Sequence, residues 1–242
     1  YMWRIRKFEE AVEDLLTSKI LGVDTETEGF DFTCKKLLML QIGDADRQYV
    51  IDCRDLTYMD QVQLTRVLNN EDIVKIFHNA KFDYKFIKHY LHIDTVNIHD
   101  TYLCEKVLHC GKTDYGFGLA KLVNRYLGKE LDKSVRNRFT QTSSTPFTDD
   151  QIIYGAKDVE YLIDIYHQQV DLLKLQNLSN VAGLENYAVI VFSEIEYNGL
   201  EINLEAWKKL ADRNKQESVV LANQLDKLLL SYPEFSSYKA KK

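Results

Sequence analysis

Two carboxylates stand two residues apart in the segment Val23-Asp24-Thr25-Glu26, which we expect to be a β-strand. Side chains at that spacing leave the same face of a sheet, so Asp24 and Glu26 would be neighbours. Such pairs are common on the exposed face of a sheet. Here the apolar neighbours favour a buried strand, in which unpaired carboxylates are costly and repel each other unless a cation lies between them.

Two further segments place polar side chains where a site could form. Asp83 follows the apolar run 73–77 and falls in the first turn of the helix expected next. Ligands often bind beyond the carboxyl ends of parallel strands, so Asp83 could belong to a binding site. The alternative is that Asp83 only stabilises the helix N-terminus, where a negative charge is favourable. Tyr154 and Asp158 are four residues apart in a helical pattern, so they share one face. Such a pair is often exposed, but the apolar residues around it favour burial.

The pattern of apolar residues predicts an α/β fold. The expected strands are residues 20–26, 37–42, 48–52 and 73–77. The expected helices in this part are residues 8–16, 61–68 and 82–91. After about residue 100 the pattern is helical, apart from a polar loop over residues 132–148. We therefore predict a mixed central sheet flanked by helices, with a C-terminal helical extension.

The composition is that of a globular protein, with 45% hydrophobic and 28% charged residues in a chain of 242. A formal net charge of −6 excludes a broadly basic surface, so nucleic-acid binding would have to be local or helped by a metal ion. The four cysteines form no C-x-x-C pair, which is typical of reduced thiols. Without a membrane-spanning apolar stretch or a signal-peptide pattern, we expect a cytoplasmic protein that binds no membrane.

Taken together, the polar motifs resemble those of a known nuclease superfamily. The chain contains D-x-E at Asp24 and Glu26, N-x-x-x-D ending at Asp83, and Y-x-x-x-D at Tyr154 and Asp158. In this order they resemble the three exonuclease motifs of the DEDD superfamily, tyrosine subclass. The resemblance covers about residues 10–175. It implies an RNase H-like (DnaQ-like) fold and 3′-5′ exonuclease activity.

Two other stretches resemble different branches of this superfamily. Residues 131–134 and 146–162 look like the ribonuclease D and Werner-type branch. Residues 184–186 and 194–203 are similar to the segment that leads from the exonuclease domain of family A DNA polymerases into the polymerase domain. The alternative is one amphipathic helix ended by Asn198-Gly199. We therefore divide the chain into an exonuclease domain, residues 1–180, and a helical segment, residues 181–242, that resembles the start of a polymerase domain.

The main functional expectation is the proofreading exonuclease of a family A DNA polymerase of the DNA polymerase I type. It would act in a bacterial or phage-infected cell on the single-stranded 3′ end of DNA. A polymerase domain would follow this segment or belong to another chain. Two alternatives remain open: a ribonuclease D-like 3′-5′ exoribonuclease, and a catalytically inactive nucleic-acid-binding or scaffold module.

A set of carboxylates without cysteine or histidine suits Mg²⁺ or Mn²⁺ rather than zinc. We expect Asp24, Glu26, Asp83 and Asp158 to hold two such ions, which activate a water and clamp the attacking and leaving oxygens. Tyr154 is a poor base at neutral pH because the ordinary pKa of tyrosine is about 10, so it would orient that water. The products would be a nucleoside 5′-monophosphate and a shortened 3′ end.

Six residues are candidates for substrate contact. The resemblance implies that Thr27, Asn79 and Phe82 lie near the terminal nucleotide, although Phe82 could equally belong to the core. The predicted loop also holds a basic cluster, which could contact phosphates or could simply be solvated. This cluster consists of Lys133, Arg136 and Arg138.

Overall fold

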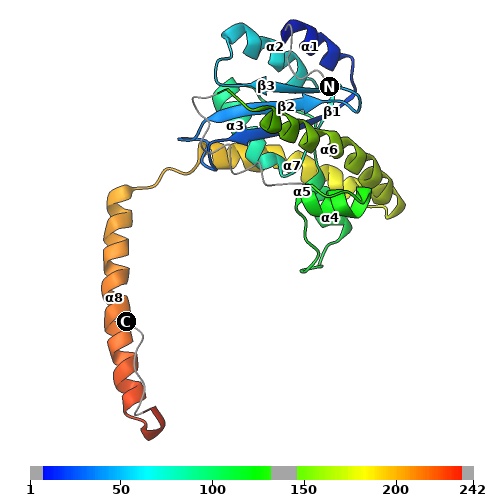
Figure 1. Ribbon diagram of the computed structural model, residues 1–242. Helices are drawn as coiled ribbons and strands as arrows, with labels where there is room; N and C mark the ends of the chain where they lie inside the picture. Colours follow the sequence, from blue (N-terminus) through cyan, green and yellow to red (C-terminus); the bar gives the residue numbers. More distant parts are fainter. Residues whose placement is uncertain (1–7, 132–145, 236–242) are drawn as a thin grey trace. The chain divides into compact units, whose positions relative to one another are not determined.

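The computed structural model describes residues 8–131 and 146–235, and the chain divides into one unit over Tyr1–Tyr197 and another over Asn198–Lys242 (Figure 1). A five-stranded sheet of order β3-β2-β1-β4-β5 forms the centre of the first unit. Its strands are β1 (Ile20–Thr27), β2 (Leu37–Gly43), β3 (Gln48–Asp52), β4 (Val74–Phe77) and β5 (Ile98–Asp100). The β1–β2 and β2–β3 pairs are antiparallel, whereas β1–β4 and β4–β5 are parallel. The predicted mixed sheet is thus confirmed.

Helices cover both faces of this sheet. In chain order they are α1 (Phe8–Leu16), α2 (Tyr58–Leu68), α3 (Ala80–Leu91), α4 (Thr101–Leu108), α5 (Leu119–Leu122), the π-helix η1 (Val123–Leu127), α6 (Asp149–Leu175) and α7 (Ser179–Asn198). Side chains of α1, α2 and α3 share one buried apolar cluster with β1. On the other face, α6 contacts β1, β2, β3 and β4. The fold is therefore α/β, and α6 bridges four strands.

The pleat of β1 sends its side chains alternately to the two faces. Leu21 and Val23 enter the apolar cluster with α1, α2 and α3. Gly22 lies under α6, because a Cβ placed there would meet Val159 of that helix. Asp24 and Glu26 follow Gly22 at steps of two, so they face the same side. Their common face is the one that the sequence predicts.

Two glycines allow α6 to lie unusually close to the sheet. A Cβ on Gly22 would come within 2.8 Å of the backbone oxygen of Val159. A Cβ on Gly155 would come within 2.7 Å of the side chain of Gln41, which is fully buried in β2. The helix begins at Asp149, where Thr148 and Gln151 form a capping box. The glycines therefore set the distance between α6 and the sheet, and the cap sets where α6 begins.

Helix α7 belongs to the first unit, so the division of the chain lies later than the expected boundary at residue 180. Ala182 and Val189 are buried on its inner side. Near its end, Glu194 accepts hydrogen bonds from Tyr84 and Lys88 of α3, each 2.6 Å long. These contacts join α7 to α3, and the compact unit continues to Tyr197 for that reason.

The second unit consists, in its described part, of α8 (Leu204–Leu230) and the short 3₁₀ helix η3 (Pro233–Phe235). Asn203 caps α8 by accepting a hydrogen bond from the backbone N–H of Ala206. No residue of α8 is buried. The likeness of residues 181–242 to the start of a polymerase domain stays a prediction. Within residues 8–131 and 146–235, no helix combines the length and the apolar character needed to cross a membrane.

Substituting Gly22→Ala should destabilise the protein, since the new Cβ would meet backbone rather than a movable side chain. We expect a loss of about 1–3 kcal/mol in the free energy of unfolding, the usual cost of overpacking a core. Urea unfolding in the presence of a chelator measures it. The control is Gly183→Ala, where a Cβ meets nothing within 4 Å and a helix gains up to about 1 kcal/mol. Equal stability of the two variants would contradict the packing argument.

Candidate active site

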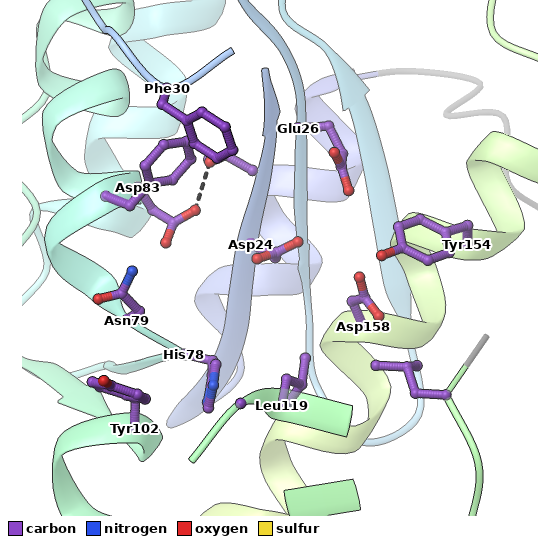
Figure 2. A pocket seen from close by; sticks show the side chains of 14 residues that line it. Asp24, Glu26, Phe30, His78, Asn79, Asp83, Tyr102, Leu119, Tyr154 and Asp158 are labelled. Atoms are coloured by element: carbon purple, nitrogen blue, oxygen red, sulfur yellow. Dashed lines mark hydrogen bonds between the residues drawn. The ribbon is translucent and has the colours of Figure 1, made fainter. Parts of the chain in front are cut away.

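The main candidate site is a cavity of about 370 Å³ at the carboxyl end of β4 (Figure 2). Strand β1 pairs with β4 only over Ile20 to Gly22; beyond that point β1 stays paired with β2 on its other edge and extends past the end of β4. The freed edge of β1, the start of α3 and one side of α6 enclose the cavity. Its lining includes all five polar residues of the predicted motifs, namely Asp24, Glu26, Asp83, Tyr154 and Asp158.

Three of the four predicted carboxylates form a compact cluster. Asp24, Glu26 and Asp158 each offer an oxygen, and these oxygens lie within 4.8 Å of one another. Glu26 and Asp158 are buried and Asp24 is half-buried. Neighbouring negative charges in such a place disfavour ionisation of each other unless a cation balances them. The donor set is entirely carboxylate oxygen, which fits a hard divalent cation and does not suit zinc.

Asp83 lines the same cavity but stands apart from this cluster. In Figure 2 its side chain approaches from α3, and Asp24 separates it from Glu26 and Asp158 in that view. The hydroxyl of Thr25 donates a hydrogen bond of 2.5 Å to its carboxylate. Burial raises the pKa of the Asp83 carboxyl to about 7, and the hydrogen bond from Thr25 opposes this shift. The fourth acid therefore lines the same cavity outside the cluster, and its burial disfavours the charged form.

Tyr154 points its hydroxyl toward the carboxylates in Figure 2. Burial raises the pKa of this phenol far above its usual value, and the charges of Asp158, Glu26 and Asp24 raise it further. A hydrogen bond to Asp158 acts in the same direction. The phenol thus keeps its proton at any physiological pH. It can orient a water molecule but cannot act as a general base, as the sequence-based argument expects.

The predicted substrate contacts divide into three groups. Asn79 and Phe82 line the cavity, and Phe82 also packs against the apolar core. Thr27 is not part of the lining; its hydroxyl donates a 2.7 Å hydrogen bond to the backbone oxygen of Gly29 and so holds a turn. The predicted contact between Thr27 and the terminal nucleotide stays a prediction. The basic cluster lies outside the described residues: Lys133, Arg136 and Arg138.

Several residues at the cavity had no signal in the sequence. Phe30 is 84% exposed at its edge, and the centroid of its ring is 6.2 Å from that of Phe82 in an edge-to-face arrangement. His78 and Tyr102 form another part of the wall. Phe30 follows Glu26 by four residues and lies in an irregular loop. Such a loop has no periodic pattern from which the orientation of a side chain could be predicted.

Comparison with known proteins agrees with this geometry. A protein-family model described as a 3′-5′ exonuclease matches residues 4–174. A ribonuclease D of Bartonella henselae is 29% identical over 212 residues, which are 86% of this chain and 49% of that protein. A DNA polymerase I of Aquifex aeolicus is 27% identical over 215 residues, 81% of this chain and 35% of that protein. The chain thus spans half or less of the length of these relatives.

Solved structures share the fold at lower sequence identity. The structure of Escherichia coli RNase D has a TM-score of 0.70 at 21% identity, covering 85% of this chain and 52% of that one. The catalytic core of RRP6 from Trypanosoma brucei has a TM-score of 0.68, also at 21% identity, covering 77% of this chain and 50% of that one. These likenesses confirm the predicted exonuclease fold.

Replacing Asp158 with asparagine should weaken divalent cation binding, because one of three clustered carboxylates is lost. We expect the Mn²⁺ affinity to fall by more than about tenfold, the smallest effect usual even for outer-shell partners of a metal. The affinity is measured by titrating Mn²⁺ into the protein and recording the electron paramagnetic resonance signal of the free ion. Asp164→Asn is the matched control, an exposed acid on the same helix. Wild-type affinity in Asp158→Asn would exclude this carboxylate as a ligand.

A second prediction concerns stability in the presence of a chelator. The native pKa of Asp83, about 7, lies above its ordinary value, so the wild-type penalty for burying this acid grows between about pH 4 and pH 7. Asp83→Asn keeps an acceptor for Thr25 and removes the charge. Its free energy of unfolding should exceed that of the wild type by at least about 1 kcal/mol at about pH 8 and by less at about pH 5.

Chemical denaturation at both pH values measures this difference. The exposed acid Asp114 provides the control, and Asp114→Asn should leave the stability unchanged at either pH. If Asp83→Asn were less stable than the wild type at the higher pH, the carboxyl would be ionised at no cost in the native protein, and the assigned pKa would be wrong.

Proposed function

This chain belongs to the 3′-5′ exonuclease family, and from that premise we propose that it trims RNA from the 3′ end by metal-dependent hydrolysis of the terminal phosphodiester bond. The observation that carries the proposal is the meeting of Asp24, Glu26 and Asp158 in one cavity with Tyr154 and Asp83. All the motif residues are present and converge, which argues against an inactive scaffold. The choice of RNA over DNA is supported by the several ribonuclease D proteins among the relatives.

The carboxylates would hold two divalent cations, Mg²⁺ or Mn²⁺. When bound, such cations lower the pKa of a coordinated water and neutralise charge on the attacking and leaving oxygens. Asp24, Glu26 and Asp158 form one set of ligands. Asp83, across the cavity, would complete the second set with Asp24 and give up its proton to do so. The cluster carries enough negative charge to repel a phosphodiester until it is loaded.

Tyr154 would position the attacking water. Its hydroxyl is hydrogen-bonded to Asp158, and its proton is retained because burial and the nearby acids raise the phenol pKa. An oxygen of this kind keeps a lone pair that can accept a hydrogen bond from water and hold it in line with the scissile bond. Attack at phosphorus releases a nucleoside 5′-monophosphate and leaves a 3′ hydroxyl on the shortened strand.

The cavity suits a single unpaired nucleotide at the end of a strand. Its volume of about 370 Å³ is at the lower end of the range for small-ligand sites. Phe30, largely exposed at the edge, and Phe82 offer ring faces and edges on which a base can stack, an interaction that tolerates any base. This arrangement would grip an unpaired 3′ end without reading its sequence.

DNA proofreading is the second candidate function. The match to a DNA polymerase I supports it, as does the likeness of residues 184–186 and 194–203 to the segment entering a polymerase domain. In that case a polymerase domain would be joined to this chain or act with it. We rank it second because the first relatives, at 29% and 31% identity, are ribonuclease D proteins.

Matched single-stranded RNA and DNA oligonucleotides labelled at the 5′ end distinguish these candidates. We expect RNA to shorten stepwise from its 3′ end in Mg²⁺ or Mn²⁺, at least about tenfold faster than DNA, because a site built around a hydroxyl discriminates strongly against its loss. A chelator should abolish the reaction. Asp158→Asn should lose activity, whereas Asp164→Asn should keep it.

If the DNA oligonucleotide were shortened faster than the RNA oligonucleotide, the ranking would be reversed in favour of proofreading. No cleavage of either strand by the wild type, with Mn²⁺ bound, would support the scaffold alternative and refute the proposed function.

A further inference from the structure

Asp100, the last residue of β5, is buried and binds the starts of two helices. Its Oδ1 accepts hydrogen bonds from the backbone N–H groups of Asn79 and Tyr102, each 2.9 Å long. Its Oδ2 accepts one of 2.8 Å from the N–H of Ala80. Since only 2% of Asp100 is exposed, these donors take the place of water. One carboxylate therefore caps α3 and α4 together.

This arrangement bears directly on the cavity wall. Asn79 and Tyr102 both line the cavity, and both donate their N–H to the same oxygen of Asp100. Asn79 stands at the N-cap of α3 in the left-handed conformation, with φ of 70°, and its side chain makes no capping hydrogen bond. Because Asp100 performs the capping, the Asn79 side chain is left to line the cavity. Asp83 lies in the first turn of the helix held in this way.

Asp100 is itself held by α7. The Oδ1 atom of Asn186 accepts a 2.8 Å hydrogen bond from the backbone N–H of Asp100. The other side-chain atom of Asn186, Nδ2, donates to Sγ of Cys104 at 3.5 Å, on α4. Asn186 lies beyond residues 4–174, the part that matches the exonuclease family. The support of the site thus extends into a helix outside the matched region.

We propose that Asp100 is a positioning residue of the exonuclease site, which fixes the first turn of α3 and the start of α4 and so places Asn79, Asp83 and Tyr102 around the cavity. The inference rests on the proposed function for the reaction that these residues serve. Asp100 is absent from the cavity lining, so it acts through the backbone of its neighbours and touches neither cation nor substrate.

The test is Asp100→Asn, compared with Asp72→Asn at an exposed acid elsewhere in the first unit. Asparagine keeps one acceptor oxygen but presents an amide nitrogen to one of the N–H donors. If the first turn of α3 loosens as a result, Asp83 is held less firmly and the affinity of the site for the cation should fall. We expect the Mn²⁺ concentration that gives half-maximal activity to rise by about tenfold or more, with activity partly recovered at high Mn²⁺. Because Mn²⁺ binding also stabilises the folded state, the folded fraction is measured at each Mn²⁺ concentration. A variant that merely folds less well would lose activity only in proportion to that fraction.

Amide hydrogen exchange gives a readout that needs no catalysis. The N–H groups of Asn79 and Ala80 should exchange faster in Asp100→Asn, while β1 amides stay protected. If Asp100→Asn does not fold, Asn186→Leu is the second variant, because it keeps the carboxylate but removes the acceptor of the Asp100 N–H. The rise in the half-maximal Mn²⁺ concentration and the faster amide exchange should then be smaller. Wild-type exchange and Mn²⁺ dependence in a folded variant would overturn the inference. A wild-type protein that cleaves neither RNA nor DNA would instead refute the proposed function, and the exchange measurement would still test Asp100.

Discussion

Backbone contact between α6 and β1 is the constraint on which this site depends. Asp158 precedes Val159, whose backbone oxygen would lie 2.8 Å from a Cβ on Gly22, and Gly22 lies two residues before Asp24 on the same face. A larger residue at that point would move the helix outward and take Asp158 away from the other carboxylates. The fold thus uses close packing to hold charges together that repel each other. A cation offsets that repulsion, so binding and stability are linked.

The cavity exists because neighbouring strands have different lengths. Strand β4 ends at Phe77, while β1 continues to Thr27, and the exposed edge of β1 is met by the start of α3. The acids therefore come from three elements that converge from different directions. A strand contributes a pair through its two-residue period, and two helices contribute one acid each. Because of this convergence, the carboxylate cluster on β1 and α6 and the carboxylate of Asp83 on α3 line the same cavity, which is large enough for the terminal nucleotide of a strand.

Local periodicity was sufficient to predict the shared face of Asp24 and Glu26 and the shared helical face of Tyr154 and Asp158. It could not bring these pairs together, and the resemblance to known nuclease motifs supplied that step. Strand β5 has three residues, too few for an alternating pattern, so the role of Asp100 had no sequence signal. Local pattern could not indicate the contacts between α7 and α3, because they join residues that are far apart in the chain. The turn in which Thr27 donates a hydrogen bond to Gly29 is a local detail that the motif does not specify.

The metal-binding chemistry of such a site does not depend on the sugar, because cations and carboxylates act on the phosphate. Selection between RNA and DNA must then come from polar groups that reach the 2′ position. In the described wall, Asn79 and Tyr102 carry polar side chains, and the backbone N–H groups of both are bound by Asp100. The same buried carboxylate binds the backbone at the start of α3, whose first turn carries Asp83. The polar groups of this wall and the fourth acid therefore share one structural support.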